Sequence, residues 1–372
     1  MRGGGGAGGG TLGLRLASPF EHLEWLESHK NARHNLGSSS VMTLSLEDVG
    51  PLDPSQPVGW GCPDGDPELV ELISELYGVD RESVLVTNGA GEAYTHIIMV
   101  CVEKGCEVLC ESPVYKPLET LPEFLGARVV RFSRAMESGF GVDVEKLKEM
   151  LSRKCRAVVL SNLHNPSCAL LGEREMKAIA ETARDAGAIL ISDEVYLDCL
   201  KRGPGPAASL ADNAVSLNSL SKAYGAGGFR LGWMLGPPEL VRAVKRLRDY
   251  TTIAPNRIGE EVAKNLLRRR EEVLARTRRL TQTNIKLFSE WADRRKDVVW
   301  HRPPGGTTCF PRILKKTPTL ELARRLYEEE GALVLPGEFF GAPGHFRIGL
   351  GQNPMATGPA LDALGRFLDR SD

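Results

Sequence analysis

The stretch Ala188-Ile-Leu-Ile-Ser192 is an uninterrupted apolar run, and it decides the fold class of this 372-residue chain. A similar run, Ala157–Ser161, precedes it, and the amphipathic segment Glu173–Ala186 lies between the two. Apolar strands separated by a helix are typical of a βαβ unit, in a parallel sheet that is buried on both faces. The core is therefore predicted to be α/β.

The same alternation extends outward from this unit over residues 84–236. The other predicted strands are Val84–Thr87, Glu107–Glu111, Arg128–Phe132, Ala214–Leu217 and Trp233–Leu235. Amphipathic helices are predicted at Ala90–Val102 and Val144–Leu151. Together these segments indicate a mainly parallel, seven-stranded sheet in a large domain.

The rest of the sequence predicts a smaller α+β domain. After Pro255 a long polar helical stretch runs to about Lys296, which we interpret as a solvated helix with i,i+4 ion pairs rather than a nucleic-acid surface. Residues 297–372 are predicted to run strand, loop, helix, strand, strand, helix. We expect a disordered glycine-rich tail at 1–14, an N-terminal segment packing on the small domain at 15–50, a large domain at 51–255, and a connecting helix with the small domain at 256–372.

Composition narrows the function classes. Lys and Arg total 47 against 48 Asp and Glu, so the net charge is -1 and gives no general attraction to nucleic acid or anionic membrane. No run of 18 apolar residues predicts a transmembrane helix, and the glycine-rich start lacks the apolar region of a signal peptide. The expected location is the cytoplasm.

The eight cysteines do not form a recognisable disulfide or metal framework. The closest cluster, Cys101, Cys106 and Cys110, lacks C-x-x-C spacing and has no complementary histidine pair. We interpret the cysteines as small buried residues in a reducing compartment, and no metal site is expected.

The most informative motif for chemistry is Ser219-Leu-Ser-Lys222-Ala-Tyr-Gly-Ala-Gly-Gly-Phe-Arg230, which follows a predicted strand. A lysine near glycines is usually part of a surface loop, but here it is accompanied by complementary groups. A lysine amine kept neutral by burial or a nearby cation can form an imine with an aldehyde. The Ser219 hydroxyl and the planar guanidinium of Arg230 can both bind phosphate.

Three further motifs also follow predicted strands. Gly89-Ala90 opens a helix, where backbone N–H groups can bind an anion, although this signal is weak alone and matches no nucleotide-binding pattern. Asp193 and Tyr196 lie at the carboxyl end of a strand, where α/β proteins bind ligands, and the pair Asp193-Glu194 could alternatively hold a metal. Asn165, before a proline, reads on sequence alone as a turn residue.

In this order and spacing, the four motifs resemble the fold-type I enzymes of the class I/II aminotransferase family, which use pyridoxal phosphate (PLP). The resemblance runs from about Trp60 to Gly351. Its most specific part is S-x-S-K followed by Arg230, eight residues after Lys222. The resemblance implies a PLP-binding large domain, amino-acid and 2-oxo-acid substrates, and a homodimer.

The resemblance also implies roles for single residues. Lys222 would bind the cofactor as a Schiff base and move protons, and Asp193 would pair with the pyridine nitrogen. The other groups implied to hold the cofactor are Tyr196 and Asn165 at its 3'-oxygen, Tyr115 stacked on its ring, and Gly89, Ala90, Ser219 and Arg230 at its phosphate. For Tyr115, a place in the core is the alternative reading. Arg347, with Asn165, would bind the substrate α-carboxylate.

Two stretches depart from the family pattern. Trp60 stands where the family usually has a tyrosine that reaches the partner subunit's phosphate, and an indole N–H could still donate there. Where the family has a glycine beside the substrate, this chain reads Asn35-Leu-Gly37-Ser-Ser-Ser40. We expect this loop to shape the substrate pocket.

The leading hypothesis is an aminotransferase that works by a ping-pong mechanism through Lys222. The alternative within the same cofactor chemistry is a β- or γ-lyase, or a cyclising synthase, acting on an amino acid. A PLP-sensing transcription regulator would need a DNA-binding domain, and the residues before Trp60 contain no helix-turn-helix pattern.

Overall fold

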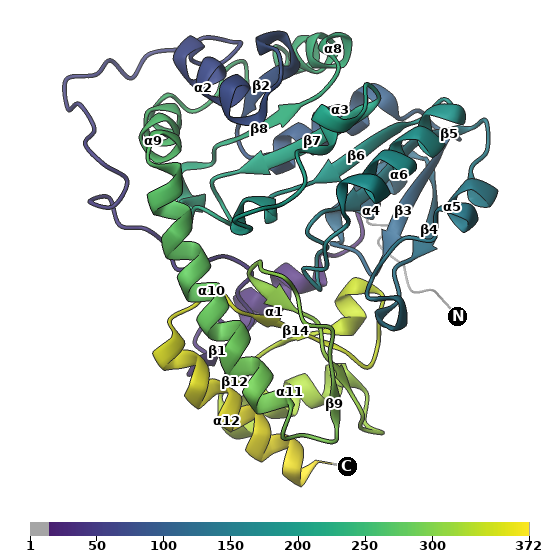
Figure 1. Cartoon of the computed structure of the whole chain (residues 1–372), viewed down its shortest axis with the longest axis vertical. Helices are drawn as coiled ribbons and strands as arrows, with labels where there is room; N and C mark the ends of the chain where they lie inside the picture. Colours follow the sequence, from purple (N-terminus) through teal and green to yellow (C-terminus); the bar gives the residue numbers. More distant parts are fainter. Residues whose placement is uncertain (1–14, 372) are drawn as a thin grey trace, which may run out of the picture.

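The computed structural model describes residues 15–371, and the predicted disorder of residues 1–14 lies outside that range. A central sheet carries the larger part of the chain (Figure 1). Its strand order is β2 (Val84–Thr87), β8 (Gly232–Leu235), β7 (Ala214–Ser219), β6 (Ile189–Asp193), β5 (Cys155–Ser161), β3 (Glu107–Ser112) and β4 (Arg128–Ser133). Only β8 runs antiparallel to its neighbours in this sheet. The predicted α/β class and the seven-stranded, mainly parallel sheet are confirmed.

Both faces of the sheet are covered by helices, which explains its apolar strands. Within β5, Val158 packs into one core and Val159 into the core on the opposite face, as the two-residue period of a strand requires. The helices that contribute to the Val159 core are α3 (Ala90–Cys101), α4 (Pro117–Leu125) and α8 (Pro238–Arg248). The opposite face is covered by α2 (Pro67–Tyr77), α5 (Val144–Met150), α6 (Glu173–Asp185), α7 (Ala207–Leu210) and α9 (Arg257–Arg268).

The polar stretch after Pro255 differs from its prediction. It forms two helices, α9 and α10 (Arg270–Ala292), with Arg269 outside both. The predicted i,i+4 ion pairs are present, as between Lys286 and Glu290. The helices are not solvated all round, however, because Leu266 and Phe288 are fully buried in the cores of the two domains. In Figure 1, α10 descends from the sheet to the smaller domain and so connects the two.

The smaller α+β domain is built on two helices and short strands. The helices are α11 (Thr319–Glu330) and α12 (Pro354–Arg370), and the strands are β9 (Val298–Val299), β10 (Thr308–Cys309), β11 (Arg312–Ile313), β12 (Ala332–Leu333), β13 (Leu335–Pro336) and β14 (Phe346–Gly349). The central strand β14 pairs with β10 and β13. Arg347 in β14 donates to Asn165 of the large domain, so this strand lies where the two domains meet.

The N-terminal segment contacts both domains. Its helix α1 is Glu21–Ser28, and its strand β1 (His34–Asn35) pairs in parallel with β12. Leu36 is buried in the core of the smaller domain, whereas the Leu44 N–H donates to the Gly225 carbonyl in the large domain. The segment thus crosses the junction between the domains.

Within residues 15–371, no helix is both long and apolar enough to span a membrane. The same part of the chain contains no group of three or more His, Cys, Asp or Glu side chains arranged to hold a metal ion. All eight cysteines are free thiols.

Candidate active site

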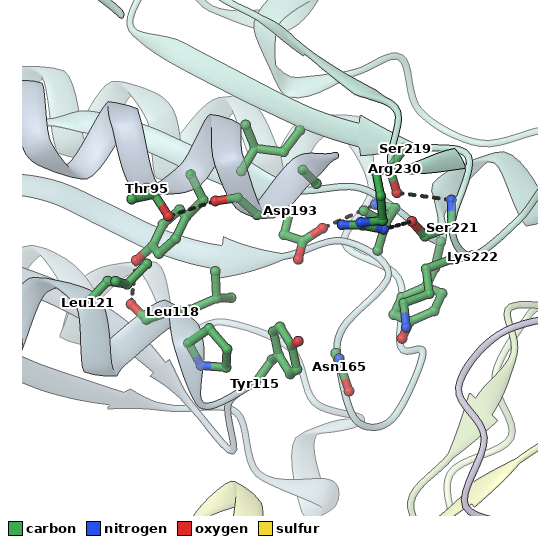
Figure 2. Close-up of a pocket in the computed structure, with 17 residues that line it drawn as sticks. Thr95, Tyr115, Leu118, Leu121, Asn165, Asp193, Ser219, Ser221, Lys222 and Arg230 are labelled. Carbon is green, nitrogen blue, oxygen red and sulfur yellow. Dashed lines mark hydrogen bonds between the residues drawn. The ribbon is translucent and has the colours of Figure 1, made fainter. Parts of the chain in front are cut away.

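The carboxyl ends of the parallel strands open into a cavity of about 510 Å³ (Figure 2). Most of the residues predicted to form a site line this cavity: Ala90, Tyr115, Asn165, Asp193, Tyr196, Ser219, Lys222 and Arg230. The other two predicted residues contact members of this group. Gly89 packs against Arg230, and Arg347 donates to Asn165.

Lys222 follows β7 and extends into the cavity (Figure 2). Its Nζ donates a hydrogen bond to the Ser39 hydroxyl over 2.9 Å. Burial, and then the charge of Arg347, lower the pKa of Lys222 to about 8. A substantial fraction of the amine is therefore neutral near physiological pH, as a nucleophile for an aldehyde requires.

Asp193 ends β6 at the middle of the cavity (Figure 2). One of its oxygens accepts from the Val195 N–H over 3.3 Å. Burial raises the pKa of Asp193 to about 6, although the positive charge of Lys222 opposes that shift. A cationic partner in the cavity, such as a protonated ring nitrogen, would stabilise this carboxylate.

A cradle for an anion lies at the start of α3. Gly89, the N-cap residue, has φ +92°, and a Cβ there would lie 2.8 Å from Nη2 of Arg230. Arg230 therefore rests directly on the helix N-terminus, where backbone N–H groups and the helix dipole already favour negative charge. Arg230 Nη1 also donates to the Ser221 hydroxyl over 3.4 Å, and Ser219 lines the same wall.

Arg347 is completely buried, and no carboxylate among residues 15–371 pairs with it. Its Nη atoms contact three neutral acceptors: Asn165 Oδ1 at 3.3 Å, His22 Nε2 at 3.1 Å and the Gly37 carbonyl at 3.1 Å. Its Nε has no hydrogen-bond partner in the described structure. A buried guanidinium without a counter-ion indicates a site for an anionic ligand group.

These residues fit PLP. The hydroxyl of Tyr196 is buried beside the Ser39 hydroxyl, and Tyr196 lines the cavity, where it can donate to a phenolic oxygen of a ligand. The Lys222 amine matches the aldehyde of that molecule, and the buried Asp193 carboxylate matches its ring nitrogen. The anion cradle at Gly89 and Arg230 matches its phosphate. Tyr115, on the same wall, is an aromatic surface for the ring.

Comparison with known proteins gives the family. Residues 59–364 match the model of the aminotransferase class I and II family. This chain belongs to that family. PLP is accordingly its cofactor, and the chain is an enzyme of the PLP-dependent aminotransferase group.

Three similar proteins illustrate the range of the family. Capreomycidine synthase of Streptomyces vinaceus is 31% identical over 350 residues, which cover 90% of this chain and 89% of that protein. A PLP-dependent aminotransferase from Streptococcus suis superposes with a TM-score of 0.91, at 28% identity over 96% of this chain and 99% of that one. The PLP-dependent cyclase OrfR superposes with a TM-score of 0.87, at 27% identity over 96% and 99% of the two chains.

The site of this aminotransferase-family enzyme also includes residues that sequence reasoning missed. Ser221 belongs to the quoted S-x-S-K motif, and its position there is a signal that could have identified it. Ser39 lies in the Asn35–Ser40 loop, which was expected to shape the substrate pocket, but the sequence did not indicate its contact with Lys222. His22 carries no signal, because it reaches Arg347 only through folding of the N-terminal segment.

The two departures from the family pattern have different outcomes. The Asn35–Ser40 loop lies at the site, where the Gly37 carbonyl accepts from Arg347. Trp60 is 81% exposed and does not line the cavity of its own chain. It lines a separate surface groove with residues 254–258.

Proposed function

We propose that this enzyme is a PLP-dependent aminotransferase that moves an amino group from an L-amino acid to a 2-oxo acid. The observation that carries the proposal is that Lys222 and Asp193 line one cavity, and that the buried Arg347 donates to Asn165, which lines the same cavity. The first would hold the cofactor, the second would tune its ring, and the third would bind the substrate carboxylate.

When bound, PLP supplies an electron sink that accepts the electrons left behind when a proton departs from the substrate Cα. Lys222 would hold the cofactor aldehyde through Nζ and would be released when the substrate amine took its place. Its free amine would then carry the proton away from the substrate Cα and return it on the opposite side of the substrate imine. A pKa of about 8 suits a group that must both accept and donate that proton near neutral pH.

Asp193 would hold the ring nitrogen in its protonated form. Opposite charges in contact attract by about 4 kcal/mol at an effective dielectric constant of 20, which would be enough to keep that proton in place. Tyr196 and Asn165 would donate to the 3'-oxygen, and Tyr115 would lie against the ring. Gly89, Ala90, Ser219 and Arg230 would bind the phosphate.

Arg347 binds the substrate α-carboxylate together with Asn165. Because this contact suits every amino acid alike, it orients the substrate without selecting its side chain. The single α-carboxylate site serves both substrates in turn, so the first product leaves before the 2-oxo acid enters. This order is a ping-pong mechanism.

A second candidate is a cyclising synthase, or a lyase that expels a β- or γ-substituent, acting on an amino acid. It is favoured by the similarity to capreomycidine synthase over 90% of this chain and to the OrfR cyclase. The same residues would remove the Cα proton, and only the fate of the resulting electrons would differ.

The test is an absorption spectrum of the PLP-loaded protein before and after addition of a panel of amino acids, with Lys222→Ala in parallel. For an aminotransferase, the visible band is lost with some amino acid and pyridoxamine phosphate is recovered by chromatography. Ammonia or a cyclic amino acid without pyridoxamine phosphate would support the second candidate instead. A visible band that persists unchanged in Lys222→Ala would contradict the assignment of the lysine.

A further inference from the structure

Ser39 touches the reacting atom of the site. The Nζ of Lys222 donates to its hydroxyl over 2.9 Å, although the two residues are 183 positions apart in the sequence. The roles proposed above leave this contact without a function. The contact is made by the amine nitrogen itself, which is the atom that the proposed mechanism would release when a substrate binds.

The fold directs the Ser39 side chain toward the lysine. The carbonyls of the neighbouring Ser38 and Ser40 lie against the end of β14. A Cβ at Gly351 would be 2.5 Å from the Ser40 oxygen, and one at Gly349 would overlap the Ser38 oxygen. The loop therefore packs its flanking residues on glycines of the smaller domain.

Hydrogen bonds fix the loop relative to the lysine. The Thr307 hydroxyl donates to the Ser39 carbonyl over 2.6 Å. The N–H of Val41, two residues after Ser39, donates to the Lys222 carbonyl over 3.4 Å. Ser39 is thus anchored to the smaller domain, and Val41, two residues later, is anchored to the backbone of Lys222. Both hydrogen bonds fix the position of the Ser39 side chain relative to the lysine.

We propose that Ser39 is a further catalytic residue, which holds the released amine of Lys222 and stabilises its protonated form. The inference rests on the proposed role of Lys222 as the cofactor lysine. A neutral hydroxyl that accepts from an amine favours the charged ammonium, because the hydrogen bond to a cation is the stronger one. Ser39 therefore stabilises the Lys222 ammonium while the lysine holds the proton that it transfers.

The charges around Lys222 make this contribution measurable. Arg347 from β14 and Arg230 beyond β7 disfavour the ammonium, Asp193 from β6 favours it, and His22 from α1 is held neutral by burial, which lowers its pKa to about 2. Ser39 acts in the same direction as Asp193. Burial and the two arginines lower the pKa of Lys222. Without the Ser39 hydroxyl, less remains to counteract them, so the pKa of Lys222 falls further.

The experiment measures the amine directly, with PLP as the probe. Full-length protein is freed of cofactor and mixed with PLP, and the rate of appearance of the visible band is followed from about pH 6 to about pH 10, which spans the Lys222 titration. The variants are Ser39→Ala, Ser39→Thr, Ser40→Ala and Lys222→Ala. Melting curves of each establish that it is folded.

A net hydrogen bond of about 1 kcal/mol corresponds to about 0.7 pH unit. We expect Ser39→Ala to lower the pKa of the rate profile by about that amount, Ser39→Thr to restore it, and Ser40→Ala to match the wild type. A Ser39→Ala profile that superimposes on the wild type overturns the role of Ser39, and so does an equal shift in Ser40→Ala. A band that forms equally fast in Lys222→Ala instead overturns the lysine assignment of the proposed function.

Discussion

At the scale of single residues, a change at Arg347 should affect substrate binding without affecting cofactor binding. Replacement by lysine keeps the charge but removes the planar pair of N–H donors. We expect Arg347→Lys to weaken amino-acid binding about 100-fold, the equivalent of about 3 kcal/mol, while PLP loads normally. Spectral titration of the loaded enzyme with its amino acid measures this, and Arg366→Lys on the exposed face of α12 is the control. Equal affinity in Arg347→Lys and wild type would contradict the role.

Glu194, next to Asp193, makes the stability of the chain depend on pH. Its side chain is buried, its Oε1 accepts from the Ala207 N–H over 2.9 Å, and burial raises its pKa from 4.5 to about 8. Between these two values the folded state holds a proton that the unfolded state has released. Stability contributed by this proton is therefore lost as the pH rises through that window.

Glu194→Gln removes this titration and keeps the acceptor for Ala207. We expect the melting temperature of the wild type to fall more steeply between about pH 5 and about pH 8 than that of the variant. The difference should reach at least about 1 kcal/mol, or about 2 °C in a chain of this size. Parallel pH slopes in thermal melts of the two proteins would show that Glu194 does not contribute.

At the scale of elements, the turn from β2 into α3 tests the phosphate cradle. Alanine at Gly89 would have to adopt φ +92° and would displace Arg230. We expect Gly89→Ala to weaken PLP binding at least about 10-fold, given a strain of about 1–3 kcal/mol. Binding of pyridoxal, which lacks the phosphate, should change much less. Gly228→Ala is the matched control, because a Cβ there meets no atom within 4 Å.

Fluorescence titrations with PLP and pyridoxal measure both affinities. If Gly89→Ala weakened the two ligands equally, the turn would be maintaining the general shape of the site and not binding phosphate.

At the scale of the whole molecule, we propose that a second copy of this chain covers the surface around Trp60. This residue and Val58 are 81% and 78% exposed, and the groove that they line also includes Pro255 and Ile258. Exposed apolar surface of this kind is typical of an interface. Sedimentation should give a mass of twice 40.6 kDa.

The variant Trp60→Glu places a charge in this interface and should weaken association at least about 10-fold. Met355→Glu, equally exposed but on α12, should leave the mass unchanged. A wild-type protein that sediments as a monomer at all concentrations would exclude the proposed homodimer.

The strands of the sheet were predictable because their signal is local. Val158 and Val159 point to opposite faces and are both apolar, so a few consecutive residues reveal a strand that is buried on both sides. The burial of α9 and α10 was not predictable, because their many charged residues are typical of an exposed helix. Arg270 shows why: it pairs with the buried Asp198 at 2.7 Å, a partner that the local sequence does not indicate.

By itself the sequence determined the α/β class and the residues that follow each strand, including Asp193, Lys222 and Arg230. These follow from strand periodicity and from motifs a few residues long. Only the tertiary structure decided that Ser39 meets Lys222 and that His22 meets Arg347. Those contacts join positions up to 325 residues apart. They depend on how the N-terminal segment packs across both domains, which no local pattern encodes.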